Sequence, residues 1–585
     1  MYVSKLIMVN NGILLGQKPI IQRFQTLGGV TMDQGAIIDR VFIALKWNGF
    51  YQTSRTAVLL LSLANLGLTA VSVVFIGKAV DHKCRQLQSF NITIQDVSYD
   101  IASNSSSLPF EISYTQCSVD VRNGSDLIFT SICRDGYEYN VSMTSSFVAE
   151  WDLVCNEESF SDFSQTVLVL GEMFGSLFLT RFADRYGRKV SFIATSLVFL
   201  AANMTCAVSP NFIFYLVFRF ITGLSVATCY QLSYILMIEM MPTAHRALPE
   251  KLCSFLWSIS LLCVCLVAYL TKELSWHYTQ LCLSLFAIYV IFLWWITDES
   301  IRWLCAVKRY KEVEDLVKKI ARINQVDPQE ALDILKTNLL SPSQIYSVES
   351  DYKNQDVLIN PAMNDAHSSH PDKKLSVFIK NTNLLKLTVF SSYTWFVDSL
   401  VYDGLLLISP NLNDDFYLGF LLGVVTELPA TLSFCLLINR IGRKKCTVLF
   451  HILAGIFILV STLILNTPLY DMIPGQYWIC LVLALLGRLS VTAGFSTTLT
   501  YVSELFPTSV RNTGMGFASV ALYLGSTIAP YSRTITRHVP WAPNVVFGIM
   551  YLTVTLAILF LPETCGHELA QTVNDMDQEM QKRNQ

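Results

Sequence analysis

Twelve long apolar runs constrain this chain more than any other feature of its sequence. A helix needs about 20 mainly apolar residues to cross the hydrocarbon core of a membrane, and each run is close to that length. Composition agrees, because 52% of the 585 residues are hydrophobic and only 15% are charged. The sequence therefore predicts an all-α membrane protein with twelve transmembrane helices. The runs lie near residues 56–77, 161–180, 190–208, 212–238, 252–271, 279–297, 385–408, 415–438, 446–465, 477–502, 513–531 and 543–561.

The short loops predict the orientation of the chain. Residues 181–189 and 439–445 carry four basic side chains each, whereas the loops 209–211 and 466–476 carry none. Lys and Arg collect on the cytoplasmic face of a membrane, so both termini are expected in the cytoplasm. The same reasoning places the long loop 78–160 outside the cell, in a protein of the plasma membrane.

The loop 78–160 has the chemistry of an extracellular segment. It contains four Asn-x-Ser/Thr sequences, which is more than chance would place in one loop. It also contains four cysteines, which favour two disulfides; three pairings are possible and the sequence does not choose among them. The glycosylation candidates are Asn91, Asn104, Asn123 and Asn140, and the disulfide candidates are Cys84, Cys117, Cys133 and Cys155.

Three short motifs occur twice in the chain, in the same order and at offsets of 255 to 265 residues. DRYGRK at 184–189 is echoed by NRIGRK, and EMMPTAHR at 239–246 is echoed by ELFPTSVR. DESIRW at 298–303 is echoed by PETCGH. The repetition predicts two pseudo-symmetric halves of six helices each, as in transporters whose halves rock about a central site.

The spans and repeats also predict the domain boundaries. The segment between the halves has no span, but residues 311–324 place apolar side chains on one helical face and charged ones opposite, which predicts an amphipathic helix. No cleavable signal peptide is expected at the N-terminus, and a second translation start at Met32 is an open alternative. The predicted domains are a cytoplasmic segment 1–55, a first half 56–297, a cytoplasmic linker 298–384, a second half 385–561 and a cytoplasmic tail 562–585.

The repeated charged residues stand at cytoplasmic helix ends and are candidate gate elements. In each repeat a glutamate precedes an arginine by seven residues, near enough for charge pairing within or between the repeats. A glycine in each basic loop permits a tight turn between antiparallel helices. The alternative is that the basic side chains only set the orientation of the chain. The gate candidates are Asp184, Arg185, Gly187, Arg188, Glu239, Arg246, Glu299, Arg302, Arg440, Gly442, Arg443, Glu504 and Arg511.

Together with the repeated motifs, several longer stretches carry a family resemblance. They are WDLVC (151–155), FRFITG (218–223), WFVDSLVYDGL (395–405), TELPA (426–430), ELFPTSVRNTG (504–514) and LPET (561–564). Over roughly residues 36–567 the chain resembles the organic cation and organic anion transporter family of the major facilitator superfamily. The resemblance implies polyspecific transport of small organic ions by alternating access, with the charged repeats closing the cytoplasmic side.

The seventh span carries a stripe suited to an organic cation. Trp395, Asp398 and Tyr402 stand at i, i+3 and i+7, which puts an indole, a carboxylate and a phenol on one helical face. Aromatic faces and carboxylates both attract a positive charge. An ionisable group inside a span is by default a functional candidate. Asp403 lies further round the helix and nearer the outer mouth, and it is a weaker candidate for the path.

Glu427 in the eighth span is a third acid at depth, and the alternative for it is a structural ion pair with Arg488 or Arg219. The resemblance adds further positions, because Tyr523 and Ser496 stand where cation carriers of the family have acids, and Tyr230 stands where the family often has Trp. The substrate-binding candidates are therefore Tyr230, Trp395, Asp398, Tyr402, Asp403, Glu427, Phe495, Ser496 and Tyr523.

These features predict facilitated uniport of organic cations or zwitterions. An organic anion exchanger is the alternative within the family, and a non-transporting surface receptor is the alternative of another class. The sequence has no Walker A motif and no cluster with metal-site spacing, so neither an enzyme nor a cofactor is expected. The expected partners are a small organic ion and the lipid bilayer, with no nucleic acid and an oligomeric state that the sequence leaves unknown.

Overall fold

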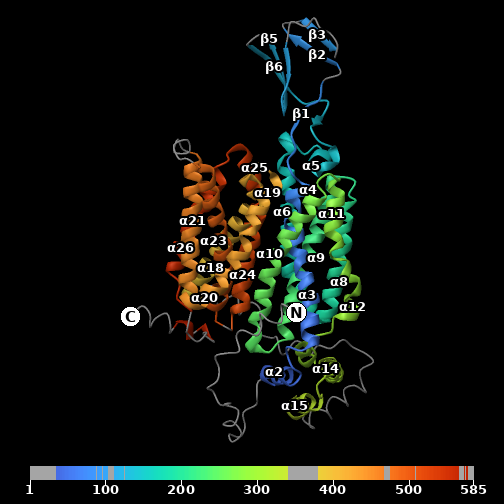
Figure 1. Ribbon diagram of the computed structural model, residues 1–585, viewed down its shortest axis with the longest axis vertical. Coiled ribbons are helices and arrows are strands. Elements are labelled where there is room, and N and C mark those ends of the chain that lie inside the picture. Colours follow the sequence, from blue (N-terminus) through green and yellow to red (C-terminus); the bar gives the residue numbers. More distant parts are fainter. Residues whose placement is uncertain are drawn as a thin grey trace.

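The computed structural model describes residues 34–86, 89–94, 97–102, 111–123, 126–339, 378, 380–466, 475–507, 509–564, 572–573 and 575–577. Within these ranges, ten helical segments are long and apolar enough to cross a membrane. The two remaining predicted spans, near 385–408 and 513–531, are helical as well, and they pack against each other within the same bundle (Figure 1). Both helices face the interior between the halves and carry polar residues there. These polar residues lower the mean hydropathy of the two helices.

The helices of the first half follow the predicted runs. They are α3 (Phe50–Ala70) with α4 (Ser72–Ile76), α6 (Ser159–Phe174) continued by a π-helical turn (Gly175–Leu179) and α7 (Thr180–Tyr186), α8 (Arg188–Ala207), α9 (Phe212–Glu239), α10 (Ala247–Leu270), and α11 (Trp276–Leu285) with α12 (Leu293–Ile296).

The second half repeats this arrangement. Its helices are α18 (Thr382–Ile408), α19 (Phe416–Val425) with α20 (Glu427–Ile441), α21 (Arg443–Leu465), α23 (Gln476–Leu505), α24 (Arg511–Ile528) with α25 (Tyr531–His538), and α26 (Ala542–Leu559).

The first span begins earlier than the predicted residue 56. The Asn324 side-chain oxygen accepts a hydrogen bond from the Tyr51 backbone N–H at 2.9 Å, and the Asn324 amide group donates to the Leu45 carbonyl at 2.8 Å. A side chain from the linker thus satisfies a backbone donor that the first turn of a helix leaves without a partner. These contacts of Asn324 stabilise a helix that begins at Phe50. Because Asn324 is distant in sequence, the hydropathy of the first span does not predict this start.

The loop 78–160 forms a strand-rich domain at one end of the bundle, which we call the strand side (Figure 1). Three small antiparallel sheets pair β1 (His82–Cys84) with β7 (Tyr137–Tyr139), β2 (Ser89–Ile94) with β3 (Val97–Ala102), and β4 (Glu111–Tyr114), β5 (Ser118–Asn123) and β6 (Asp126–Ile132) in that order. Of the three possible disulfide pairings, the structure has Cys84–Cys133 and Cys117–Cys155.

The glycosylation candidates lie in or beside this strand-rich domain. Asn140 is exposed, and the backbones of Asn91 and Asn123 lie in β2 and β5. Asn104 lies outside the described residues.

The opposite end, which we call the linker side, carries a second small core. It joins α2 (Gln34–Ala44), α13 (Ile301–Ala306), α14 (Tyr310–Asn324) and α15 (Gln329–Leu339). α14 is the predicted amphipathic helix, and its apolar face is buried in this core, where α14 packs against α13 and α15 and α15 packs against α2. An ion pair of 2.5 Å between Asp39 and Arg302 fastens α2 to the start of α13.

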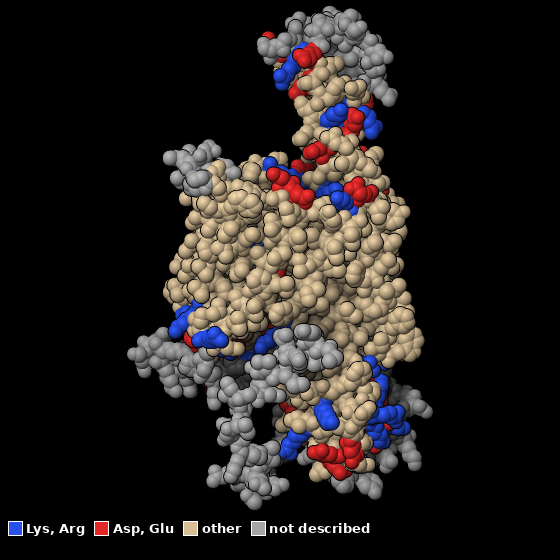
Figure 2. Space-filling model, viewed as in Figure 1, with Lys and Arg blue, Asp and Glu red and all other residues tan. Residues whose placement is uncertain are grey.

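The charge distribution on the surface matches a membrane protein. Figure 2 shows Lys, Arg, Asp and Glu gathered at the two ends of the molecule, with a broad band between them that is almost free of charge. Such a band lets lipid cover the helices without burying ionised groups.

Candidate functional site

A cavity of about 580 Å³ lies between the two halves. Its walls come from α3, α6, α9 and α10 of the first half and from α18, α20, α23 and α24 of the second. This is the central position expected for the substrate site of a transporter built from two repeats.

Aromatic side chains form much of the wall. The Trp257 indole N–H donates a hydrogen bond to the Tyr402 hydroxyl at 2.6 Å and joins the two halves across the cavity. The rings of Tyr402 and Phe495 lie 5.4 Å apart. The aromatic residues that line the cavity are Tyr230, Tyr234, Trp257, Trp395, Tyr402, Phe434, Phe495 and Tyr523.

Four carboxylic acids line the same cavity, namely Glu172, Glu250, Asp403 and Glu427. No Lys, Arg or His is among the described lining residues. Only Glu427 has an ion-pair partner among the described residues; Arg488 lies behind the wall with its Nη2 at 3.0 Å from Glu427 Oε1. The described part of the cavity wall therefore carries four carboxyl groups and no basic side chain.

Glu427 has the ion-pair partner that the sequence offered as an alternative. Arg488 also donates to the Gly423 carbonyl at 3.2 Å, and its guanidinium lies 5.6 Å from the Tyr402 ring. Thr492 adds a hydrogen bond of 3.2 Å to Glu427 Oε1. Glu427 thus lines the cavity and pairs with Arg488, and its part in substrate binding stays a prediction.

Asp398 differs from its predicted place, because it does not line the cavity. Its Oδ1 lies 2.9 Å from His451 Nε2, and both side chains are fully buried. His451 Nδ1 lies 2.8 Å from the Thr447 carbonyl oxygen, so both ring nitrogens face acceptors. The Tyr551 ring stacks on His451 at 4.7 Å and closes the cluster.

Helix rotation explains this difference. The cavity-lining residues of α18 include Trp395, Ser399, Tyr402, Asp403 and Leu406, whose face is centred near Ser399. Asp398 lies about 100° from that centre, because each helical residue turns the chain by that angle. Asp403, the weaker candidate from sequence, lies on the cavity face.

The other eight predicted binding residues all line the cavity. Sequence reasoning missed Glu172 and Glu250 among the acids and Tyr234 and Trp257 among the aromatic residues. Glu172 had a signal, because an acid inside a predicted span is a functional candidate. Glu250 had no such signal, because it precedes the predicted fifth span and was expected to lie in a loop.

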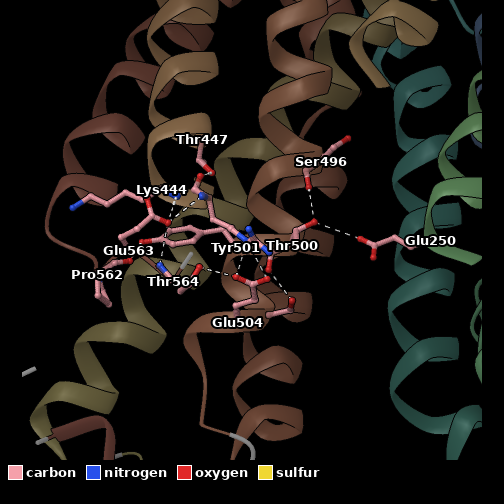
Figure 3. Close-up of polar contacts among 12 residues, drawn as sticks. Glu250, Lys444, Thr447, Ser496, Thr500, Tyr501, Glu504, Pro562, Glu563 and Thr564 are labelled. Atoms are coloured by element: carbon pink, nitrogen blue, oxygen red, sulfur yellow. Dashed lines mark hydrogen bonds and ion pairs between the residues drawn. The ribbon is translucent and has the colours of Figure 1, made fainter. Parts of the chain in front are cut away.

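The repeated motifs build matching structures at the linker side. In the first half, Arg188 pairs with Glu239 at 3.6 Å and with Asp184 at 3.1 Å. In the second half, Arg443 pairs with Glu504 at 3.2 Å (Figure 3). Each glutamate of the E-x-x-P-T motif thus pairs with the arginine of the basic loop in its own half, and not with the arginine seven residues after it.

A second repeated glutamate closes each basic turn. Glu299 accepts hydrogen bonds from the backbone N–H groups of Arg188 at 2.9 Å and Lys189 at 3.1 Å. Glu563 does the same for Arg443 at 3.0 Å and Lys444 at 3.2 Å (Figure 3). A carboxylate at a helix N-terminus satisfies unpaired donors and complements the helix dipole.

Burial affects the Glu299 carboxyl more than these hydrogen bonds do. Burial raises the pKa of Glu299, while the backbone donors of Ser300, Lys189 and Arg188 oppose the rise. Gly187 and Gly442, at φ of 102° and 103°, occupy the turns beside the two carboxylates.

The remaining gate candidates have varied surroundings. Arg302 pairs with Asp39, Arg511 donates to the Phe506 carbonyl at 3.2 Å, Arg185 lies 5.5 Å from the Tyr186 ring, Arg246 is partly buried, and Arg440 is exposed.

On the strand side, α6 and α25 hold the two halves together. Arg533 pairs with Asp162 at 2.6 Å, and Thr534 donates to the same carboxylate at 2.6 Å. Glu158 pairs with Arg537, and the Thr166 hydroxyl donates to the Thr527 carbonyl at 2.9 Å. Among the described residues, every ion pair between the halves lies at this end. We call this set of contacts the strand-side latch.

The comparisons with known proteins agree with this architecture. The family model "Sugar (and other) transporter" matches residues 97–348 and 389–575. Solute carrier family 22 member 2 of Homo sapiens is 27% identical, over 90% of this chain and 93% of that protein. Solute carrier family 22 member 6 of Pseudopleuronectes americanus is 29% identical, over 76% of this chain and 74% of that protein. The organic cation transporter protein of Drosophila melanogaster is 27% identical, over 76% of each.

Solved structures show the same fold. The inward open structure of the xylose transporter XylE from E. coli aligns with a TM-score of 0.54 at 15% identity, over 90% of this chain and 99% of that one. A structure of the same protein, described as a major facilitator superfamily proton:xylose symporter, aligns with a TM-score of 0.53 at 14% identity, over 90% of this chain and 99% of that one. With the repeated halves, the central cavity and the family match over most of its length, the chain belongs to the Sugar (and other) transporter family and is a multi-pass membrane transporter, not an enzyme.

Proposed function

We propose that this protein carries small organic cations across the plasma membrane by alternating access. The observation that carries the proposal is the cavity wall, which combines eight aromatic side chains and four carboxylic acids with no described basic residue. Aromatic faces attract organic cations by about 0.5 to 2 kcal/mol each, and more strongly where water is excluded. The match to an organic cation transporter protein supports the same substrate class.

The predicted orientation assigns the two ends of the molecule. The strand side is extracellular, because it carries the disulfides and the glycosylation sequences. The linker side, with both termini, is cytoplasmic. The strand-side latch then closes the extracellular entrance, so the cavity of this conformation serves the cytoplasmic side.

Uniport driven by the membrane potential is the simplest mechanism. A potential of 100 mV contributes about 2.3 kcal/mol per elementary charge, which accumulates a monovalent cation about 50-fold. No coupling ion is then required. The acids of the cavity hold the cation, and rocking of the two halves exposes it to either side in turn.

Uptake of labelled tetraethylammonium in cells expressing the wild type and Asp403→Asn tests the proposal. We expect potential-sensitive uptake by the wild type and a loss of about tenfold in the variant at equal surface abundance, which corresponds to about 1.4 kcal/mol. Asp414→Asn is the matched control, because it removes the same charge from an exposed loop residue close in sequence.

The other outcomes identify the alternatives. Exchange of labelled organic anions without cation uptake indicates an anion exchanger of the same family. Saturable ligand binding without accumulation in wild-type cells indicates a surface receptor. Cation uptake that does not change on depolarisation contradicts uniport driven by the membrane potential, but it does not contradict the substrate class.

A further inference from the structure

The acids of the cavity stand at two depths. On α23, Thr492 donates to Glu427 Oε1 at 3.2 Å, and Thr500 donates to Glu250 Oε1 at 3.4 Å. These threonines are eight residues apart on one helix, which separates them by about 12 Å along its axis. Figure 3 shows Glu250 reaching across from its own helix toward Thr500, on the turn beyond Ser496. We call the depth of Glu427 the upper level and the depth of Glu250 the lower level.

α18 gives a second measure of the same separation. Tyr402 belongs to the upper level, because its ring lies beside Arg488 and Phe495. Trp395 lies seven residues toward the linker side on the same face, about 10 Å away. It therefore stands near the lower level, on the cavity wall.

The lower level has an aromatic side chain as well as a carboxyl group. The Trp395 side chain is about 95% buried and lines the cavity. Its indole ring can attract a positive centre at this depth. Glu250 and Trp395 thus supply a carboxyl group and an aromatic face at one depth.

The charges of the two levels do not neutralise each other. At the upper level, Glu427 pairs with Arg488, which also interacts electrostatically with Asp403. Glu172 interacts electrostatically with Asp403 and Arg219. At the lower level, Glu250 interacts with Lys251, which is exposed and does not line the cavity. A monovalent cation can bind at one level or the other. The acid at the other level, about 12 Å away, then has no positive centre of the cargo beside it.

We propose that the preferred cargo is an organic dication whose two positive centres lie about 10 to 12 Å apart, one at the upper level and one at Glu250. The inference rests on the proposed function, since it specifies the class of organic cation. An extended chain advances about 1.2 Å per bond, so a diamine of about seven to nine carbons spans the two levels. Both ends are then solvated by carboxylates and aromatic faces at once.

Uptake of a series of unbranched α,ω-diamines, each compared with the monoamine of the same chain length, tests the inference. We expect the apparent affinity of the wild type to peak at the long diamines, about tenfold above the matching monoamine. Glu250→Gln should abolish this advantage, so that the diamine and the monoamine of the same chain length have apparent affinities within about twofold of each other. Glu273→Gln, an exposed acid outside the cavity, is the matched control and should leave the advantage intact.

Two further measurements keep the test decisive. Parallel recording of tracer and current should give two charges per diamine and one per monoamine. Trp395→Leu removes the aromatic face at the lower level, so it substitutes for Glu250→Gln if that variant fails to reach the surface; it should reduce the diamine advantage.

The inference and the proposed function fail differently. Monoamine uptake without any length optimum, or an equal loss of both substrates in Glu250→Gln, overturns the dication inference alone. Absence of uptake for both series, together with anion exchange, overturns the proposed function.

Discussion

The acidic side chains inside the bundle fall into those that line the cavity and those that are buried away from it. Asp398 belongs to the second group, because its carboxylate is fully buried against His451 and does not reach the cavity. Asp403, five residues along the same helix, belongs to the first. Two acids of one helix thus have different tasks because the helix turns about 100° per residue.

Asp398→Asn is expected to act on stability and not on substrate affinity. Removing one partner of a buried charged pair costs about 3 to 5 kcal/mol, because the other partner stays buried without compensation. Thermal melting of the purified protein should shift downward, while the KM for a transported cation stays within about twofold for the molecules that reach the surface. His451→Ala should lower the melting temperature similarly. An unchanged melting curve with a raised KM would instead place Asp398 at the substrate.

Glu427 and Arg488 form a second buried pair, at the cavity wall, and a double substitution separates its two roles. Arg488→Met leaves the carboxylate without its base and should lower the melting temperature, by about 3 kcal/mol in free energy. The double variant Glu427→Gln/Arg488→Met removes both charges and should recover most of that stability. If Glu427 also binds the cation, the double variant should still transport with a raised KM. Full recovery of transport as well as stability would restrict Glu427 to a structural role.

At the scale of secondary-structure elements, the repeated motifs make the same helix junction twice. Each junction has a glycine in the left-handed region of φ, a following helix whose first N–H groups bind a glutamate, and an arginine held by another glutamate. Among the described residues, the ion pairs of each junction lie within its own half in this conformation, and a part of the junctions in gating stays a prediction.

Alanine at either glycine of these junctions should destabilise the protein to a similar extent. A Cβ on Gly187 would stand 2.5 Å from Glu299 Oε2, and one on Gly442 would stand 3.0 Å from Glu563 Oε2. A non-glycine residue at positive φ adds about 1 to 2 kcal/mol of strain. We expect Gly187→Ala and Gly442→Ala both to lower thermal stability, with the larger effect at Gly187. Gly516→Ala is the control, because its Cβ would meet no described atom within 4 Å.

For the whole molecule, the sequence predicts the bundle well because lipid imposes a simple rule on it. Twelve apolar runs, a charge bias and three repeated motifs are enough to place the spans and to pair the halves. The predicted site agrees with the cavity wherever an aromatic or acidic residue lies on a helix that faces the centre. Glu172, like Glu427, is an acid inside a predicted span, so the same reasoning could have identified it as a candidate.

What the sequence leaves open depends on distant contacts. The rotation of α18 is set by packing, and His451, the partner of Asp398, is 53 residues away. Glu250 lies in the first turn of α10, and its side chain points toward Thr500 of the other half. The disulfide pairing and the strands of the loop domain likewise depend on tertiary contacts that no local pattern encodes.

A cross-link across the strand-side latch should stop the rocking of the two halves. Asp162 lies on α6 of the first half, and Arg533 and Thr534 lie on α25 of the second, so alternating access has to separate them. Cysteines in place of Asp162 and Thr534, joined by a short bifunctional thiol reagent, should abolish uptake by holding the extracellular side closed. Either single cysteine, treated in the same way, should retain uptake. Undiminished uptake by the cross-linked double variant would contradict rocking of the halves about the central cavity.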